Sequence, residues 1–243
     1  MVEKAPAKVT GKEFYIPHRA VIRENAKSTR LRVVYDALAR AYDGVPSLNE
    51  CLHTGPPLQN ELWNVIVHNR FHPIAVAGDM RKSFLQIRVK EAERDALRFH
   101  WMKDKSTEEL EVLRFTRVVF GLAPSRFLLD AVIQQHLESV QSEYPGTVQE
   151  IKNSLYVDDL ITGDTTVEGA QQLKHNAVEI FNRAKFTLHK WHSNVPELKG
   201  DYTDDEPSFT KQQLGASSAR GECKLLGLKW DKGDDTLYDS FPS

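Results

Sequence analysis

The stretch Leu155-Tyr156-Val157-Asp158-Asp159-Leu160 decides the predicted fold, because it places two adjacent carboxylates between two short apolar runs. Residues 153–157 and 160–162 are predicted to be strands, and Asp158-Asp159 the turn of a hairpin between them, since Asp favours tight turns. Carboxylates held in the open at a turn suit Mg²⁺, which takes oxygen ligands. A lone Asp pair is more often only a polar turn, so a metal site requires a third carboxylate.

Asp79 is the candidate for that third carboxylate. Residues 72–77 form an apolar run that predicts a buried strand, and Asp79 stands just past its end. Three carboxylates close together repel one another unless cations compensate. Two Mg²⁺ ions would compensate, and a two-metal site supports in-line displacement at phosphorus. Taken alone, Asp79 is equally well explained as a cap between a strand and a loop.

Other motifs follow in a recognisable order along the chain. Phe84 stands five residues after Asp79, and Phe120-Gly121-Leu122-Ala123-Pro124-Ser125 lies between Asp79 and the Asp pair. Together these motifs resemble the palm of a reverse transcriptase. The sequences that flank them resemble the Bel/Pao class of LTR retrotransposons (Pao polyprotein). Further stretches that carry the resemblance are residues 31–36, 46–49, 54–58, 95–99 and 189–194. It covers residues 15–230 and implies an α+β fold with fingers and a palm, whose antiparallel sheet is backed by helices.

The resemblance implies an RNA-directed DNA polymerase that extends a primer 3′-OH. It assigns catalysis to Asp79, Asp158 and Asp159, which with the backbone carbonyl of Met80 would hold two Mg²⁺ ions, for which Mn²⁺ can substitute. The residues that it assigns to nucleotide binding are Arg32, Lys27, Phe84, Phe120 and Gly121, and those that it assigns to the primer grip are Leu226, Gly227 and Trp230.

The same resemblance names the expected partners. They are an RNA or DNA template with its primer, deoxynucleoside triphosphates, and the protease, ribonuclease H and integrase domains of a polyprotein, all outside this chain. The implied location is the cytoplasm, within a virus-like particle, with a nuclear step also open and no secretion. No apolar run is long enough to cross a membrane, so no membrane partner is expected.

Composition and charge exclude few classes of protein. The 243 residues carry a formal net charge of −2, which is not typical of a nucleic-acid binder. Basic residues nevertheless crowd the front of the chain, where they could follow a phosphate backbone, although a solvated charged face explains them equally well. The two cysteines, Cys51 and Cys223, are too few for a disulfide framework and favour a reducing compartment.

Pattern and resemblance together divide the chain. The expected parts are a flexible tail over 1–13, fingers over 14–57, a palm over 58–195 with part of the fingers at 85–118, an acidic loop over 196–222, and a primer-grip-like hairpin with a truncated end over 223–243. Predicted helices cover 58–69, a segment capped by Ser125, and a segment capped by residues 164–166. Predicted strands cover 20–22, 32–36, 84–89, 97–102, 113–120 and 186–191, with loops at 90–95 and 103–111.

Two alternatives remain open at this point. The chain departs from the Bel/Pao pattern at Leu38, Val119 and Arg126, and it resembles an isolated fingers–palm portion of a longer polyprotein. A catalytically decayed or domesticated palm, acting as a nucleic-acid- or protein-binding module, would fit these departures. A two-metal nuclease would also use three aspartates, but it would not need Phe84 or the Phe120-Gly121 pair.

Overall fold

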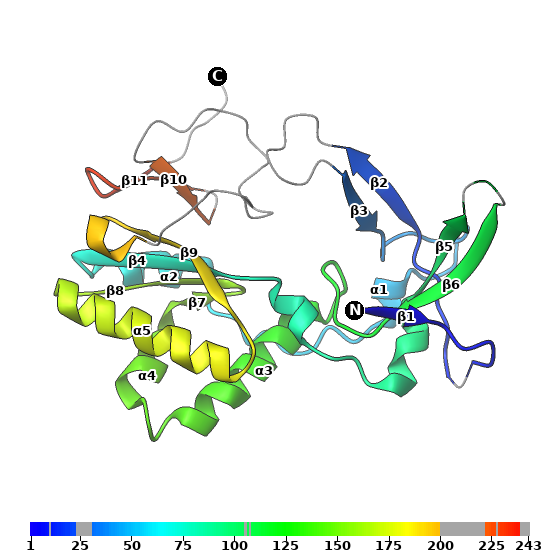
Figure 1. Ribbon diagram of the computed structural model, residues 1–243, viewed down its shortest axis with the longest axis horizontal. Coiled ribbons are helices and arrows are strands. Elements are labelled where there is room, and N and C mark those ends of the chain that lie inside the picture. Colours follow the sequence, from blue (N-terminus) through cyan, green and yellow to red (C-terminus); the bar gives the residue numbers. More distant parts are fainter. Residues whose placement is uncertain are drawn as a thin grey trace. The chain divides into compact units, whose positions relative to one another are not determined.

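The computed structural model describes residues 1–9, 11–22, 31–104, 106, 108–199, 222–226 and 228–238. The chain divides into two compact units (Figure 1). Unit 1 comprises Met1–Leu58 and Lys82–Val132, and unit 2 comprises Gln59–Arg81 and Ile133–Ser243. Each is described by itself below.

Unit 1 contains two antiparallel sheets. The first has the strand order β1-β6-β5, and the second pairs β2 with β3. The bounds are β1 Val2–Lys4, β2 His18–Ile22, β3 Leu31–Tyr35, β5 Arg98–Asp104 and β6 Glu109–Phe115, with the short helices α1 Leu48–Cys51, η1 Ser83–Gln86 and η2 Glu91–Leu97. α1 begins with a capping box, in which Ser47 and Glu50 each accept a hydrogen bond from the other's backbone N–H.

Aromatic rings fill the core of unit 1. The ring of Tyr35 meets that of Phe115 edge-on at 4.8 Å and that of Phe99 at 5.1 Å. Ile16 and Leu97 are buried in the same cluster. The edge-on geometry is favourable for packed rings, so side chains join β3 to β5 and β6, which belong to the other sheet.

Unit 2 is built on one four-stranded antiparallel sheet with the order β7-β8-β4-β9, and a smaller sheet with the order β10-β11-β12. The strands are β4 Ile74–Met80, β7 Leu155–Tyr156, β8 Asp159–Asp164, β9 Leu188–Ser193, β10 Glu222–Leu225, β11 Leu228–Asp231 and β12 Thr236–Tyr238. The helices are α2 Leu62–Arg70, α4 Pro145–Ser154, α5 Val167–Arg183 and η3 Pro196–Leu198, while α3 Ser125–Val140 begins in unit 1 and ends in unit 2.

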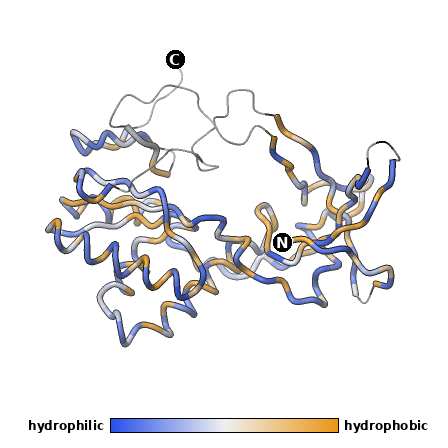
Figure 2. Tube along the Cα trace, in the orientation of Figure 1, coloured by the Kyte–Doolittle hydropathy of each residue, from blue (hydrophilic) through white to orange (hydrophobic). Residues whose placement is uncertain are grey.

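Helix α5 backs the larger sheet. Thr166 caps its first turn by accepting a hydrogen bond from Gly169 N at 3.1 Å, as the sequence predicts. Hydrophilic and hydrophobic residues alternate along α5 (Figure 2), and its apolar stripe is buried at Ala177, Ile180 and Phe181. α4 and α5 lie on one side of the sheet and the β10–β11 hairpin on the other (Figure 1).

The mixture of helices and antiparallel sheet confirms the α+β class, but several predicted elements are wrong. Residues 1–13 are not simply a tail, because β1 pairs with β6 and Glu3 binds Arg114 at 2.7 Å. Residues 84–89 are not a strand: the backbone of η1 turns through i-to-i+3 bonds, such as Ile87 N to Phe84 O at 3.1 Å. Part of the loop expected at 90–95 is η2.

Two further boundaries differ from the prediction. The strand expected at 113–120 begins earlier, at Glu109, and ends at Phe115, after which Val118 N bonds outside the sheet to Ile87 O at 3.0 Å. The strand expected at 153–157 is reduced to Leu155–Tyr156, because α4 runs from Pro145 to Ser154 and buries Val148 and Ile151 on one face. The strands predicted at 97–102 and 186–191 are confirmed as β5 and β9 within a few residues.

Candidate active site

Asp79 and Asp159 face each other across two central strands. Asp79 is the sixth residue of β4, whose preceding residues Ala75, Val76 and Ala77 are buried, and Asp159 is the first residue of β8. The two are direct partners in the β4–β8 register. Residues opposed in this way have Cβ atoms about 4.5–5.5 Å apart on one face of the sheet, so the fold brings two carboxylates together from positions far apart in the sequence.

Asp158 joins them through the hairpin. The turn consists of Val157 and Asp158, because Tyr156 pairs with Asp159. The predicted Asp158-Asp159 turn is therefore displaced by one residue, and Asp159 belongs to β8. The backbone O of Asp158 accepts a hydrogen bond from Met80 N at 2.8 Å. Val157 has φ +56°, a left-handed value that costs a β-branched residue about 1–3 kcal/mol.

The face on which Asp79 and Asp159 stand follows from strand alternation. Asp79 is in phase with Ala77, and Asp159 with Ile161. Ala77 and Ile161 pack with Trp230 in one apolar cluster. The two carboxylates thus share the face of the smaller sheet, opposite to α4 and α5.

Strand β9 supplies a histidine that the sequence motifs did not single out as a site residue. His189 is the register partner of Asp79, and its Nε2 lies 3.8 Å from Asp79 Oδ1. The β4–β9 register shifts between Ala77 and Asp79, and Lys190 in that bulge has φ +51°. The shift sets His189 opposite Asp79. The sequence offered one signal, since His189 lies in a stretch that carries the family resemblance.

The donor types at this strand end suit a hard cation. Asp79 is 8 % exposed, while Asp158 and Asp159 are partly exposed, so the group joins a buried carboxylate to accessible ones. Their mutual charge favours cation binding. Met80 could contribute only its backbone carbonyl, because Mg²⁺ takes oxygen ligands and the side chain carries sulfur. Among the described residues, the group whose three ligand atoms already lie within 4.8 Å of one another is a different one, His68, His72 and Glu150.

The residues expected to bind nucleotide belong to unit 1, whereas the three aspartates belong to unit 2. Phe84 is buried in η1, with its ring 5.7 Å from that of Phe120, which is 60 % exposed. Gly121 has φ +93°, which only glycine adopts without strain. Asn49, which the sequence did not single out, bonds to Gly121 O at 2.9 Å and to Ala123 N at 2.8 Å, and so holds this turn.

Two of the remaining predicted site residues, Lys27 and Gly227, lie outside the described residues. Arg32 lies on β3 opposite Val21. Of the primer-grip residues, Leu226 has φ +49° in the β10–β11 turn. Trp230 is 1 % exposed and donates from Nε1 to Asp235 Oδ1 at 2.9 Å. It supports the hairpin from within, and its role in a primer grip stays a prediction.

Comparison with known structures decides the type of fold. The structure of the foamy viral protease–reverse transcriptase in complex with an RNA/DNA hybrid matches 93 % of this chain with a TM-score of 0.58 and 14 % identity. This chain has a reverse-transcriptase-like fold. The crystal structure of the native Prototype Foamy Virus protease–reverse transcriptase matches 79 % of it, with a TM-score of 0.55 and 16 % identity.

The match covers only part of those proteins. The reverse-transcriptase-like chain spans 24 % and 22 % of the two viral chains. No family model matches its sequence, and a search of curated proteins finds no match. Within the described part of the chain, no helix is both long and apolar enough to cross a membrane.

Proposed function

We propose that this chain is the fingers–palm part of an RNA-directed DNA polymerase, with unit 2 as the palm and unit 1 as the fingers. The observation that carries the proposal is the direct pairing of Asp79 with Asp159 at one end of β4 and β8, with Asp158 in the adjoining turn. The reverse-transcriptase-like fold supports it. The order of the motifs supports a Bel/Pao-type origin, with protease, ribonuclease H and integrase domains outside the chain.

Asp79, Asp158 and Asp159, with the carbonyl of Met80, would hold two Mg²⁺ ions in this proposal. When bound, such ions lower the pKa of a primer 3′-OH and neutralise charge on the departing pyrophosphate. The chain's own contribution is placement. Asp79 and Asp159 are fixed by the β4–β8 ladder, and Asp158 by the bond from Met80 N to its carbonyl.

The fingers would bind the incoming deoxynucleoside triphosphate. Arg32 would grip phosphate oxygens, because a guanidinium binds them in a bidentate fork, and Lys27 would add a second contact. Phe84, Phe120 and Gly121 would line the pocket for sugar and base. The open space beside Gly121, where an added Cβ would meet no atom within 4 Å, agrees with a role at a surface that a ligand approaches.

Primer extension on an RNA template tests the proposal. We expect the untagged chain, alone or with the downstream polyprotein segment, to add deoxynucleotides in Mg²⁺ or Mn²⁺ and to stop in excess chelator. Asp158→Asn should lower extension by about 1,000-fold or more, since the lost charge stabilisation is worth several kcal/mol. Asp43→Asn, an exposed acid of unit 1, is the matched control. Extension by Asp158→Asn within a few-fold of the parent would contradict the assignment.

The main alternative is a palm that binds without catalysis. Its sequence support comes from Val119 and Arg126, yet Val119 packs in the unit 1 core and its carbonyl accepts a bond from Ser125 Oγ at 2.7 Å. The fold therefore accommodates this departure. Template–primer binding that falls steeply with salt, without extension under any metal condition, would favour the binding module over the polymerase.

A further inference from the structure

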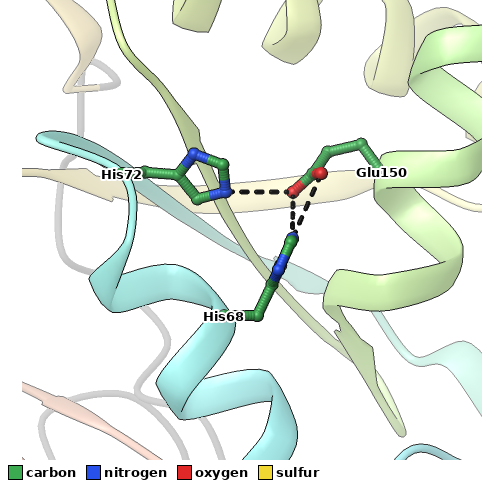
Figure 3. Close-up of side chains that lie close together, drawn as sticks. All are labelled: His68, His72 and Glu150. Atoms are coloured by element: carbon green, nitrogen blue, oxygen red, sulfur yellow. Dashed lines mark hydrogen bonds and ion pairs between the residues drawn. The ribbon is translucent and has the colours of Figure 1, made fainter.

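A second polar cluster lies in unit 2, next to β8 but away from the aspartates. His68 in the last turn of α2 and His72 just after it converge with Glu150 of α4 (Figure 3). His68 Nε2 lies 3.0 Å from Glu150 Oε1 and 3.2 Å from Oε2, and His72 Nε2 lies 3.5 Å from Oε1. Asp159 of the aspartate group and Thr162 beside this cluster both lie on β8. They are three positions apart, which is about 10 Å along the strand.

The carboxylate of Glu150 is fixed in place by two hydroxyl groups. Ser154 Oγ and Thr162 Oγ1 each donate to its Oε1 at 2.7 Å. An oriented carboxylate beside two imidazoles is the donor set of a zinc site with three protein ligands.

Two of the three separations between the ligand atoms also fit zinc, and all three are within 4.8 Å. Zn–N and Zn–O bonds of tetrahedral sites place ligand atoms about 3.4 Å apart, and the two histidine nitrogens lie 3.0 and 3.5 Å from Glu150 Oε1. His72 Nε2 is buried and makes no hydrogen bond. A buried nitrogen without a hydrogen bond is unfavourable, and a cation between the three side chains would satisfy it.

The surrounding backbone makes room for this arrangement. A Cβ added at Gly163 would stand 2.6 Å from His72 Cβ, so glycine at this position of β8 lets the His72 ring approach. Asn69, buried at 2 % exposure, donates to Thr162 O at 2.9 Å and holds α2 against the same strand. α2, α4 and β8 thus converge on one point.

We propose that His68, His72 and Glu150 form a zinc site that ties α2 to α4 and, through Thr162, to β8. Imidazole ligands favour Zn²⁺ over Mg²⁺, so this site is distinct in its metal from the aspartate group. The fourth position is left for water. The proposal does not depend on the polymerase assignment.

Zinc titration of the untagged chain tests the site. The chain is first stripped with a chelator, then titrated with Zn²⁺ against a chromophoric competitor, and Co²⁺ absorption reports tetrahedral coordination. We expect one Zn²⁺ per chain with an affinity tighter than micromolar, unchanged by millimolar Mg²⁺. His72→Ala should weaken binding by at least about 100-fold, and Thr162→Val by about 10- to 100-fold through loss of the bond that orients Glu150.

Matched variants separate this site from others. His175→Ala, an exposed histidine on α5, and Asp158→Asn should both bind Zn²⁺ like the parent. Far-UV circular dichroism checks that each variant is folded, and His68→Ala repeats the test should His72→Ala not fold. Absence of binding at micromolar Zn²⁺, equal affinity in folded His72→Ala and His68→Ala variants, or loss of binding in Asp158→Asn would each overturn the proposal.

Discussion

Asp95 in unit 1 and Asp79 in unit 2 are both buried carboxylates, but their surroundings are opposite. Asp95 Oδ1 accepts a bond from Arg98 Nε at 3.0 Å and from an Arg114 nitrogen at 2.9 Å. Asp79 stands opposite Asp159, and His189 Nε2 lies 3.8 Å away. An acid between two arginines holds the fold together, whereas an acid that faces another acid suits a site that binds cations.

The largest expected effect is on the arginine-bound acid. Burial raises the pKa of Asp95, but the bonds from Arg98 and Arg114 outweigh it and hold this pKa below its usual value. Asp95→Ala leaves two buried guanidinium groups without that partner, so the free energy of unfolding should fall by about 3–5 kcal/mol. Urea denaturation measures this free energy of unfolding. A loss under about 1 kcal/mol would contradict the structural role that distinguishes Asp95 from Asp79.

The pH dependence of stability at Asp130, another buried acid, tests the same comparison between kinds of buried carboxylate. Asp130 of α3 is 6 % exposed, and burial raises its pKa to about 6, although the charge of Arg126 opposes this. The folded state then binds more protons than the unfolded state between the unfolded and folded pKa values, so stability falls as pH rises from about 4 to about 6. Asp130→Asn should raise stability at pH 7.5 by about 1–3 kcal/mol.

The check for Asp130 is urea denaturation at several pH values. The Asn variant should lose the decline between about pH 4 and 6 that the parent shows. Asp95 contributes with the opposite sign, because its lowered pKa gives stability above the unfolded pKa that is lost in acid. A parent and an Asp130→Asn variant with parallel pH profiles would show that Asp130 is ionised at no cost.

Phe84 extends the comparison to an uncharged side chain. Its ring could serve the core of unit 1 or a nucleotide-binding pocket. The family resemblance places an aromatic ring at this position under the sugar of the incoming nucleotide, where it would exclude a 2′-OH. Phe84→Val should keep deoxynucleotide incorporation and reduce discrimination against ribonucleotides by about 10- to 100-fold. Single-nucleotide incorporation rates for matched sugars measure it. Unchanged discrimination would leave Phe84 as a core residue packed against Phe120.

The smallest expected effect belongs to Asp159. Like charges on opposed residues of a sheet are destabilising, so Asp159→Asn should raise the free energy of unfolding by about 0.2–1 kcal/mol without metal. Its primer extension should suffer less than that of Asp158→Asn. Thermal unfolding with and without Mg²⁺ shows whether the substitution stabilises or destabilises the chain. A destabilised Asp159→Asn variant would show that the carboxylate pairs with a positively charged side chain.

The sequence predicted much of the fold where apolar patterns are strong. The strand ending near Asp79, the capped helix α5 and the edge strand β9 are all present. It failed where tertiary bonds override local pattern. η1 reads as a strand because Phe84, Leu85 and Ile87 are apolar, yet its backbone turns. β1 is polar and gains its order from pairing with β6 and from the bonds of Glu3 to Arg94 and Arg114.

The candidate site was predictable in part for a related reason. Short motifs name Asp79, Asp158 and Asp159, and the register then pairs the first with the third. His189 could not be placed opposite Asp79 from the sequence, because a bulge sets that register. Glu150 lies 82 residues from His68, and no local pattern joins them. The roles of Arg32, Lys27 and the primer-grip residues stay predictions.

The bulge in β9 has a consequence for how this sequence can change over time. Trp191, buried at 6 %, lies over Gly78 so closely that a Cβ added there would stand 2.9 Å from its indole ring. A side chain added at position 78 would therefore displace Trp191 or the strand that presents Asp79. In related sequences the two positions should therefore vary as a pair, with a larger residue at 78 only where 191 is smaller. A drifting copy that broke this pairing would lose its aspartate geometry while every aspartate remained in its sequence.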